Sequence, residues 1–130
     1  MADPVATAEQ LYAALDEDET APFLDLCAVD VVVEYPSHAS LTWAGRWEGR
    51  NGVRAFLDAH DAAEEILEFS VARFVADGEV VVAIGTFTAR AKGTGREWTT
   101  PFVHLLTIRD ERLHRWQAFF DTAAAVTAHA

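Results

Sequence analysis

The spacing of hydrophobic residues changes at about Ile66, from helical repeats to long strands that turns separate. In residues 4–15, apolar side chains recur every three to four positions, Asp3 can serve as the N-cap and Pro4 suits the first helical position. The apolar positions of this predicted helix are Val5, Ala8, Leu11, Tyr12 and Leu15. The first half of the chain is therefore expected to be mainly helical.

Two further helices are predicted before the strands begin. The first is short, from about Ala21 to Cys27, with Thr20 as its cap. Residues 29–35 are β-branched and apolar, which predicts a strand, and residues 36–50 have no period, which predicts a long loop with a short strand of its own at most. Asn51 then caps a third helix. Its buried stripe is Val53, Phe56, Leu57 and His60.

The rest of the chain has the pattern of a meander of four long strands. The predicted strands are residues 66–75, 80–91, 96–108 and 113–120. Asp77-Gly78, residues 92–95 and Asp110-Glu111 supply the turns between them. Asp121-Thr122 can cap a final short helix through Val126.

These strands are apolar on both faces, most clearly at residues 80–82, so both faces of the sheet need cover. Helices can cover one face, and a second subunit is the simplest cover for the other, which predicts a homodimer through the outer sheet face. The expected fold class is α+β, a cone-shaped barrel in which a strongly curved mixed or antiparallel sheet wraps around helices and leaves an apolar pocket at its open end.

Composition narrows the class of protein. The 130 residues suit a single domain over residues 1–130, and 51% of them are apolar, as in a globular protein. The single cysteine, Cys27, allows no internal disulfide and is expected to be buried in a cytoplasmic protein. The formal charge is −11, and residues 1–45 contain no Lys or Arg, so nucleic acid and membrane partners are not expected.

The sequence contains no cofactor or metal motif. The five histidines are scattered and form no ligand spacing with carboxylates or the cysteine, so neither a metal nor a cofactor is expected. Residues 93–95 are too short to cradle a phosphate and lie between strands rather than before a helix.

The order of elements, taken with several short segments, resembles the nuclear transport factor 2-like superfamily. The segments that carry the resemblance are residues 11–15 (LYAAL), 31–36 (VVVEYP), 43–50 (WAGRWEGR), 93–96 (GTGR) and 115–121 (RWQAFFD). The chain is most similar to the SnoaL-like branch, which is related to polyketide cyclases and ketosteroid isomerases. The resemblance implies the fold, and it says less about activity because this fold hosts many functions.

Residue by residue, the resemblance transfers only part of the family's chemistry. The isomerase base corresponds to Tyr35, and the first-helix tyrosine of the oxyanion hole corresponds to Leu11. The second aspartate corresponds to His104, or with a gap to Val103, so the isomerase triad is absent. The polyketide cyclases' aspartate corresponds to Ala118, while their strand histidine matches His104.

His104 is the principal candidate for chemistry. In an apolar pocket its pKa would fall and the imidazole would be neutral, able to donate a hydrogen bond to a ligand oxygen or to act as a base. Tyr35 would assist as a donor, and Asp121 is the second candidate acid or base, although its position suits a helix N-cap. The predicted ligand-binding residues are Leu11, Tyr35, His38, Trp43, Trp98, Thr100, Phe102, His104, Trp116, Ala118 and Phe120.

Two hypotheses of function use the pocket, and a third, a purely structural dimerisation domain, would leave its many aromatic residues as filler. The first is a cofactor-free isomerase, cyclase or related enzyme that acts on a hydrophobic carbonyl compound by acid/base chemistry. The second is a ligand-binding or accessory protein with the same pocket and no turnover. In both, the partner is a small hydrophobic molecule.

Overall fold

The structure is a computed structural model, and it describes residues 3–17 and 19–130. Its elements in chain order are α1 (Pro4–Leu15), α2 (Ala21–Asp25), β1 (Cys27–Tyr35), β2 (Gly45–Glu48), α3 (Gly49–Ala63), β3 (Glu64–Asp77), β4 (Val80–Ala91), β5 (Glu97–Arg109), β6 (Arg112–Phe120) and α4 (Thr122–His129). The predicted order of helices and strands is confirmed.

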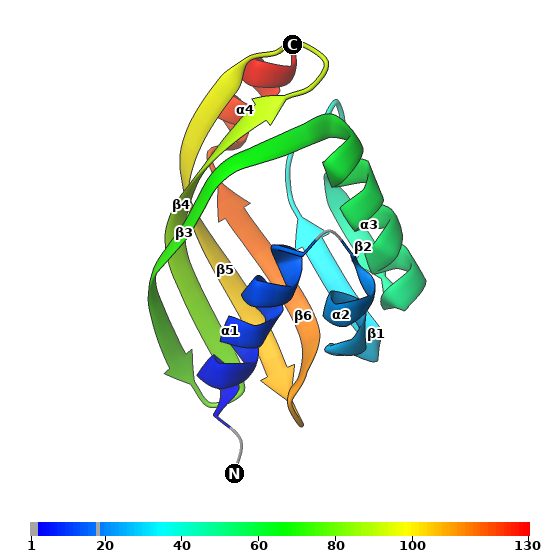
Figure 1. Ribbon diagram of the computed structural model, residues 1–130, viewed down its shortest axis with the longest axis vertical. Helices are drawn as coiled ribbons and strands as arrows, with labels where there is room; N and C mark the ends of the chain where they lie inside the picture. The colour runs from blue at the N-terminus through cyan, green and yellow to red at the C-terminus, as the bar shows by residue number, and fades with distance from the viewer. Residues whose placement is uncertain (1–2, 18) are drawn as a thin grey trace.

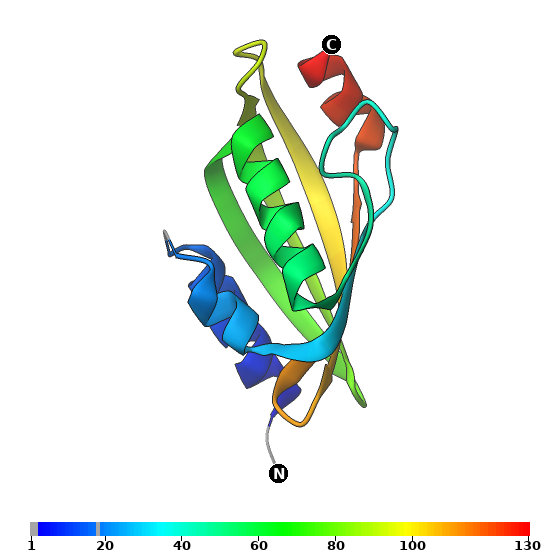
Figure 2. The ribbon, with the colours of Figure 1, turned by 90° about the vertical axis from the view of Figure 1, so that its right-hand side faces the viewer.

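The strands form one six-stranded sheet in the order β2-β1-β6-β5-β4-β3. Neighbouring strands are antiparallel except β1 and β6, which pair in parallel. The sheet curves around α1 and α3, which lie on its concave face (Figures 1 and 2). The α+β cone expected from the sequence is therefore confirmed, with a mixed sheet.

The curvature has local causes in β3 and β4. The register of β3 against β4 shifts between Ile66 and Glu68 and again between Val71 and Arg73, and such bulges bend a strand. Gly85 lies opposite Val71, and a Cβ there would stand 2.1 Å from a backbone oxygen of β3 and 2.7 Å from the Phe102 ring. Only glycine permits this close approach, so the sequence builds the bend into the sheet.

The helix ends follow the local signals in part. Asp3 accepts a hydrogen bond from the backbone of Val5, and Asp121 accepts one from Ala124, so both predicted caps are confirmed. Thr20 makes no side-chain cap, which corrects one expectation. Asn51 lies inside α3 and does not cap it, because Gly49, with φ +73°, turns the chain directly from β2 into the helix.

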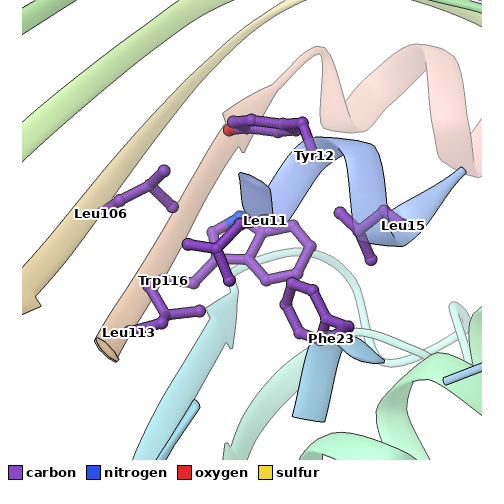
Figure 3. Close-up of a pocket in the computed structure, with 7 residues that line it drawn as sticks. All are labelled: Leu11, Tyr12, Leu15, Phe23, Leu106, Leu113 and Trp116. Atoms are coloured by element: carbon purple, nitrogen blue, oxygen red, sulfur yellow. The ribbon is translucent and has the colours of Figure 1, made fainter. Parts of the chain in front are cut away.

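The base of the cone is a packed core. Figure 3 shows side chains from α1, α2, β5 and β6 around a void of only about 10 Å³, hardly room for one water molecule. Its lining consists of Leu11, Tyr12, Leu15, Phe23, Leu106, Leu113 and Trp116. Cys27 is also fully buried, as expected from the sequence. No helix among the described residues is long and apolar enough to cross a bilayer.

Candidate functional site

A cavity of about 610 Å³ opens between the concave face of the sheet and the helices α1, α2 and α3. Figure 2 shows α3 running along the sheet with α1 and α2 beyond its end. Aromatic and histidine side chains form much of the wall: Tyr12, Phe23, Tyr35, Trp43, Phe56, His60, Phe69, Phe87, Trp98, His104, Trp116 and Phe120. The volume is in the range of a site for a small organic molecule.

His104 and Tyr12, which both line this wall, are hydrogen-bonded to each other. The register of β5 directs His104 to the concave face, where the side chain is 4% exposed. Its Nδ1 lies 2.7 Å from the Tyr12 hydroxyl, which α1 supplies from 92 residues away in sequence. A neutral imidazole carries one N–H, so the pair retains one proton beyond their shared bond, on His104 Nε2 or on the Tyr12 oxygen.

Burial sets the protonation of both groups. Desolvation lowers the pKa of His104 to about 3, so its imidazole is neutral at pH 7. Desolvation also raises the pKa of Tyr12 and of Tyr35 above that of an exposed phenol, so both keep their protons. The pocket therefore offers uncharged hydrogen-bond donors at this end, and a histidine with so low a pKa is a weak base.

Aromatic rings surround the His104 imidazole. Phe102 lies 4.4 Å and Trp116 5.3 Å from it between ring centroids, and Tyr35 lies at 6.4 Å. Tyr35 itself contacts Phe56 of α3 at 4.8 Å and Phe120 at 5.7 Å. These contacts exclude water from the imidazole, which is the physical cause of its low pKa.

A second polar group, centred on Glu64, lies in the part of the cavity near α4. The Glu64 side chain is 1% exposed, and its Oε1 accepts hydrogen bonds from Trp98 Nε1 at 3.1 Å and from His129 Nε2 at 2.7 Å. His60 Nε2 lies 3.2 Å from Oε2. The Trp43 ring packs against both imidazoles, at 5.4 Å from His60 and 4.8 Å from His129.

The described residues contain no group of three or more His, Cys, Asp or Glu side chains arranged to hold a metal ion. In the Glu64 group, the carboxyl group is hydrogen-bonded to the Trp98 indole and the His129 imidazole, and the His60 imidazole lies beside its other oxygen.

The structure places the predicted ligand-binding residues in different surroundings. Six of them line the cavity: Tyr35, Trp43, Trp98, His104, Trp116 and Phe120. Leu11 lines the small void at the base instead, and Phe102 is buried behind the wall, stacked on Phe69. His38 is exposed and bonds to Ser40 in the loop after β1, outside the cavity wall.

Three of the remaining predicted residues lie near the end of β6. Ala118 is fully buried and pairs directly with His104, so no carboxylate faces the imidazole from that strand. Thr100 Oγ1 accepts a hydrogen bond from the backbone N–H of Asp121 and donates to the Pro101 carbonyl. Asp121, a candidate acid or base from the sequence, is exposed and has its carboxylate in the N-cap of α4.

Sequence reasoning missed Tyr12, Glu64 and His129 as site residues, and treated His60 as a packing residue. The signal at Tyr12 was its polar tip on the apolar stripe of α1. Glu64 begins β3 and His129 ends α4, and their contact spans 65 residues. Nothing in the local pattern around either residue indicates that contact.

Comparison with known proteins identifies the family. The model of the SnoaL-like domain matches residues 8–116, so the chain belongs to this family. No curated protein matches the chain.

Solved structures show the same fold over the whole length. An NTF2-like protein from Burkholderia xenovorans is 26% identical, with 98% of this chain and 95% of that one covered and a TM-score of 0.87. An NTF2-like protein of unknown function from Burkholderia pseudomallei is also 26% identical, with 100% and 99% covered and a TM-score of 0.88. TerC, co-crystallised with polyporic acid, is 23% identical, with 97% of each chain covered and a TM-score of 0.87.

Proposed function

We propose that the protein binds a small hydrophobic carbonyl compound in the 610 Å³ cavity and acts on it as a cofactor-free isomerase or cyclase. The observation that carries the proposal is the buried pair of His104 and Tyr12, which retains one proton for a ligand oxygen. A carbonyl that accepts this proton in a hydrogen bond becomes more polarised, which makes its α-protons more acidic.

The roles of the residues follow from their protonation. His104 is neutral and serves as the donor to the oxygen, directly or through Tyr12, rather than as the base. Tyr35 lines the same part of the cavity and keeps its phenol proton, so it is a second donor. The surrounding aromatic rings hold the apolar body of the ligand and keep water away from the developing charge.

Non-catalytic binding in the same cavity is the second candidate, and one observation favours it. Ala118, not a carboxylate, pairs with His104 across the sheet, and Asp121 is engaged as a helix cap. Neither residue therefore gives His104 the neighbouring proton acceptor that an isomerase needs. A binding protein needs only the donors and the apolar wall.

A pair of matched ligands tests the donor role of His104 and Tyr12, which both candidate functions share. We expect androst-5-ene-3,17-dione to bind more tightly than the corresponding hydrocarbon, as measured by quenching of tryptophan fluorescence, because Trp43, Trp98 and Trp116 line the cavity. Tyr12→Phe and His104→Gln should each weaken binding of the ketone by about tenfold relative to binding of the hydrocarbon, since one hydrogen bond is lost. The control His114→Gln changes a histidine of β6 that does not line the cavity.

Conversion of this ketone to the conjugated enone, followed by ultraviolet absorbance, would establish the isomerase. Binding without conversion would favour the second candidate. Equal losses for ketone and hydrocarbon in both variants would contradict the donor role of the pair.

We also propose that a second copy of the chain covers the outer face of the sheet. The register places apolar residues of four neighbouring strands on that face, and several are exposed: Val75 at 39%, Ile84 at 38% and Phe119 at 47%. Burying them would stabilise a dimer. Ile84→Lys should then convert the dimer to a monomer in sedimentation experiments. A wild-type chain that sediments as a monomer would contradict the proposal.

A further inference from the structure

The entrance of the cavity is lined by carboxylates. Among the described residues, six exposed acidic side chains contribute to its lining: Asp16, Glu17, Glu19, Asp58, Asp61 and Glu65. Lys92 is the lining residue with an ammonium group, and its Nζ donates to the backbone oxygen of Asp61 at 2.5 Å. Arg90 lies 3.5 Å from Glu65. Of these six carboxylates, Glu65 is the one with a basic side chain as a partner.

This distribution of charge selects among ligands before they reach the interior. A cleft lined by one sign of charge raises the local concentration of ligands of the opposite sign and repels those of the same sign. The electrostatics of the entrance therefore disfavour carboxylates and phosphates and favour cations.

Glu64 adds an acidic side chain in the interior of the cavity to those at the entrance. Its side chain lines the cavity and is 1% exposed. Both hydrogen bonds that it accepts go to Oε1, whereas Oε2 is buried without a hydrogen-bond partner. The imidazole of His60 is near this oxygen, at 3.2 Å, but the contact lacks hydrogen-bond geometry, so Oε2 keeps its capacity to accept a donor. A buried acceptor without a partner is costly, and a ligand group that donates to it removes the cost.

The walls near Glu64 suit a cation with an apolar body. Trp98 and Trp43 pack around the Glu64 group, and Phe56 and Phe87 extend the aromatic lining. The faces of such rings attract ammonium groups, most strongly where water is excluded. His104, at the other part of the cavity, is neutral, and the imidazoles that lie against Glu64 itself are those of His60 and His129.

From these observations we infer that the ligand is a hydrophobic amine, whose cationic nitrogen binds between Glu64 Oε2 and the neighbouring aromatic rings. The inference rests on the proposed binding of a small molecule, and it adds that this molecule carries a positive charge. Glu64 contacts Trp98 of β5. Trp98 and His104 are six residues apart on this strand, which is about 20 Å along an extended chain. The amine and the oxygen that His104 and Tyr12 recognise therefore lie toward opposite ends of one elongated molecule.

Three probes of one shape test the sign of the charge. They are 2-naphthylmethylamine, which is a cation at pH 7, the neutral 2-naphthylmethanol and the anionic 2-naphthoate, each titrated into the protein by calorimetry at low salt. We expect the amine to bind about tenfold more tightly than the alcohol, as for a hydrogen bond to a charged partner, and the carboxylate to bind most weakly. An alcohol that binds as tightly as the amine would overturn the inference and leave the proposed small-molecule site standing. Failure of all three to bind would contradict both.

Two variants locate the interaction. Glu64→Gln should remove most of the amine's advantage and leave the alcohol within about twofold, because the side chain keeps its shape and its Oε1 acceptor. Glu68→Gln is the matched control, since Glu68 is exposed on the same strand and pairs with Thr88 on the outer face. An amine advantage that survives Glu64→Gln would overturn the assignment to this residue.

If Glu64→Gln does not fold, a surface variant tests the preference for a cationic ligand instead. Asp58→Asn combined with Asp61→Asn changes two exposed side chains of α3 and should not affect folding. It should slow association of the amine and reduce the dependence of its rate on salt, with no effect on the alcohol. Unchanged association of the amine would overturn the role of the acidic entrance.

Discussion

Lowering the pH should destabilise the protein through His104. The histidine has a pKa of about 3 in the folded chain, because its ring is buried among aromatic side chains. In the unfolded chain the pKa returns to about 6.5. Between these two values the unfolded state binds a proton that the folded state does not, so the free energy of unfolding falls as the pH falls through this window.

The size of the effect follows from the two pKa values. At pH 7.5 both states are largely neutral at this position, and at pH 5 only the unfolded state is protonated. The pH then lies about 1.5 units below the unfolded pKa, and each unit corresponds to about 1.4 kcal/mol, so the contribution of His104 at pH 5 is a loss of about 2 kcal/mol.

Urea denaturation at a series of pH values measures this loss, and a non-titrating variant isolates it. The total pH dependence also contains contributions from other groups, so the informative quantity is the difference between wild type and His104→Gln. We expect the wild-type free energy of unfolding to fall by about 2 kcal/mol more than that of the variant between pH 7.5 and pH 5.

Two parallel stability curves would refute the reasoning, since they would mean that His104 titrates alike in the folded and unfolded chains. A direct measurement is the ¹³C–¹H spectrum of the imidazole, in which the His104 signal should stay at its neutral position at pH 5.

Three further results are expected. Gly85→Ala should lower the free energy of unfolding by about 2 kcal/mol or more, because the new Cβ would meet backbone at 2.1 Å, whereas Gly93→Ala, with open space around it, should change it by less than about 0.5 kcal/mol in the same urea titration. Asp121→Ala should cost about 1 kcal/mol through the lost N-cap of α4 and leave ligand affinity unchanged; a loss of affinity at constant stability would restore Asp121 as a site residue. Burial raises the pKa of the Cys27 thiol to about 12, so an aromatic disulfide reagent at pH 8 should modify it only after unfolding, and rapid modification of the native chain would show that this part of the core opens.

Local signals in the sequence determined most of the elements. The Asp77-Gly78 turn and the left-handed pair Asp110 and Glu111 end strands where the pattern predicts, and Asp3 begins α1 as expected. These features depend on residues a few positions apart, whose backbone preferences act in the same way in any fold. Asn51 shows the limit of such signals, because the turn at Gly49 starts α3 before the predicted cap.

The candidate site was predicted in part. The period of two in β5 correctly grouped Trp98, Thr100, Phe102 and His104 on one face, and all four are buried. The same period could not tell which of them meet the cavity, since that depends on what packs against each. Thr100 bonds to the start of α4, and Phe102 lies over Gly85, so neither lines it.

The sequence by itself determined the class of fold, the caps of α1 and α4, the turns and the set of residues that alternate inward on each strand. Only the tertiary structure decided that Tyr12 meets His104, that His129 returns to Glu64, and that β1 pairs in parallel with β6. The physical reason is the range of the interactions. Propensities and periodicity act over a few residues, whereas these contacts join segments up to 92 residues apart and form only when the curved sheet brings the helices together around its concave face.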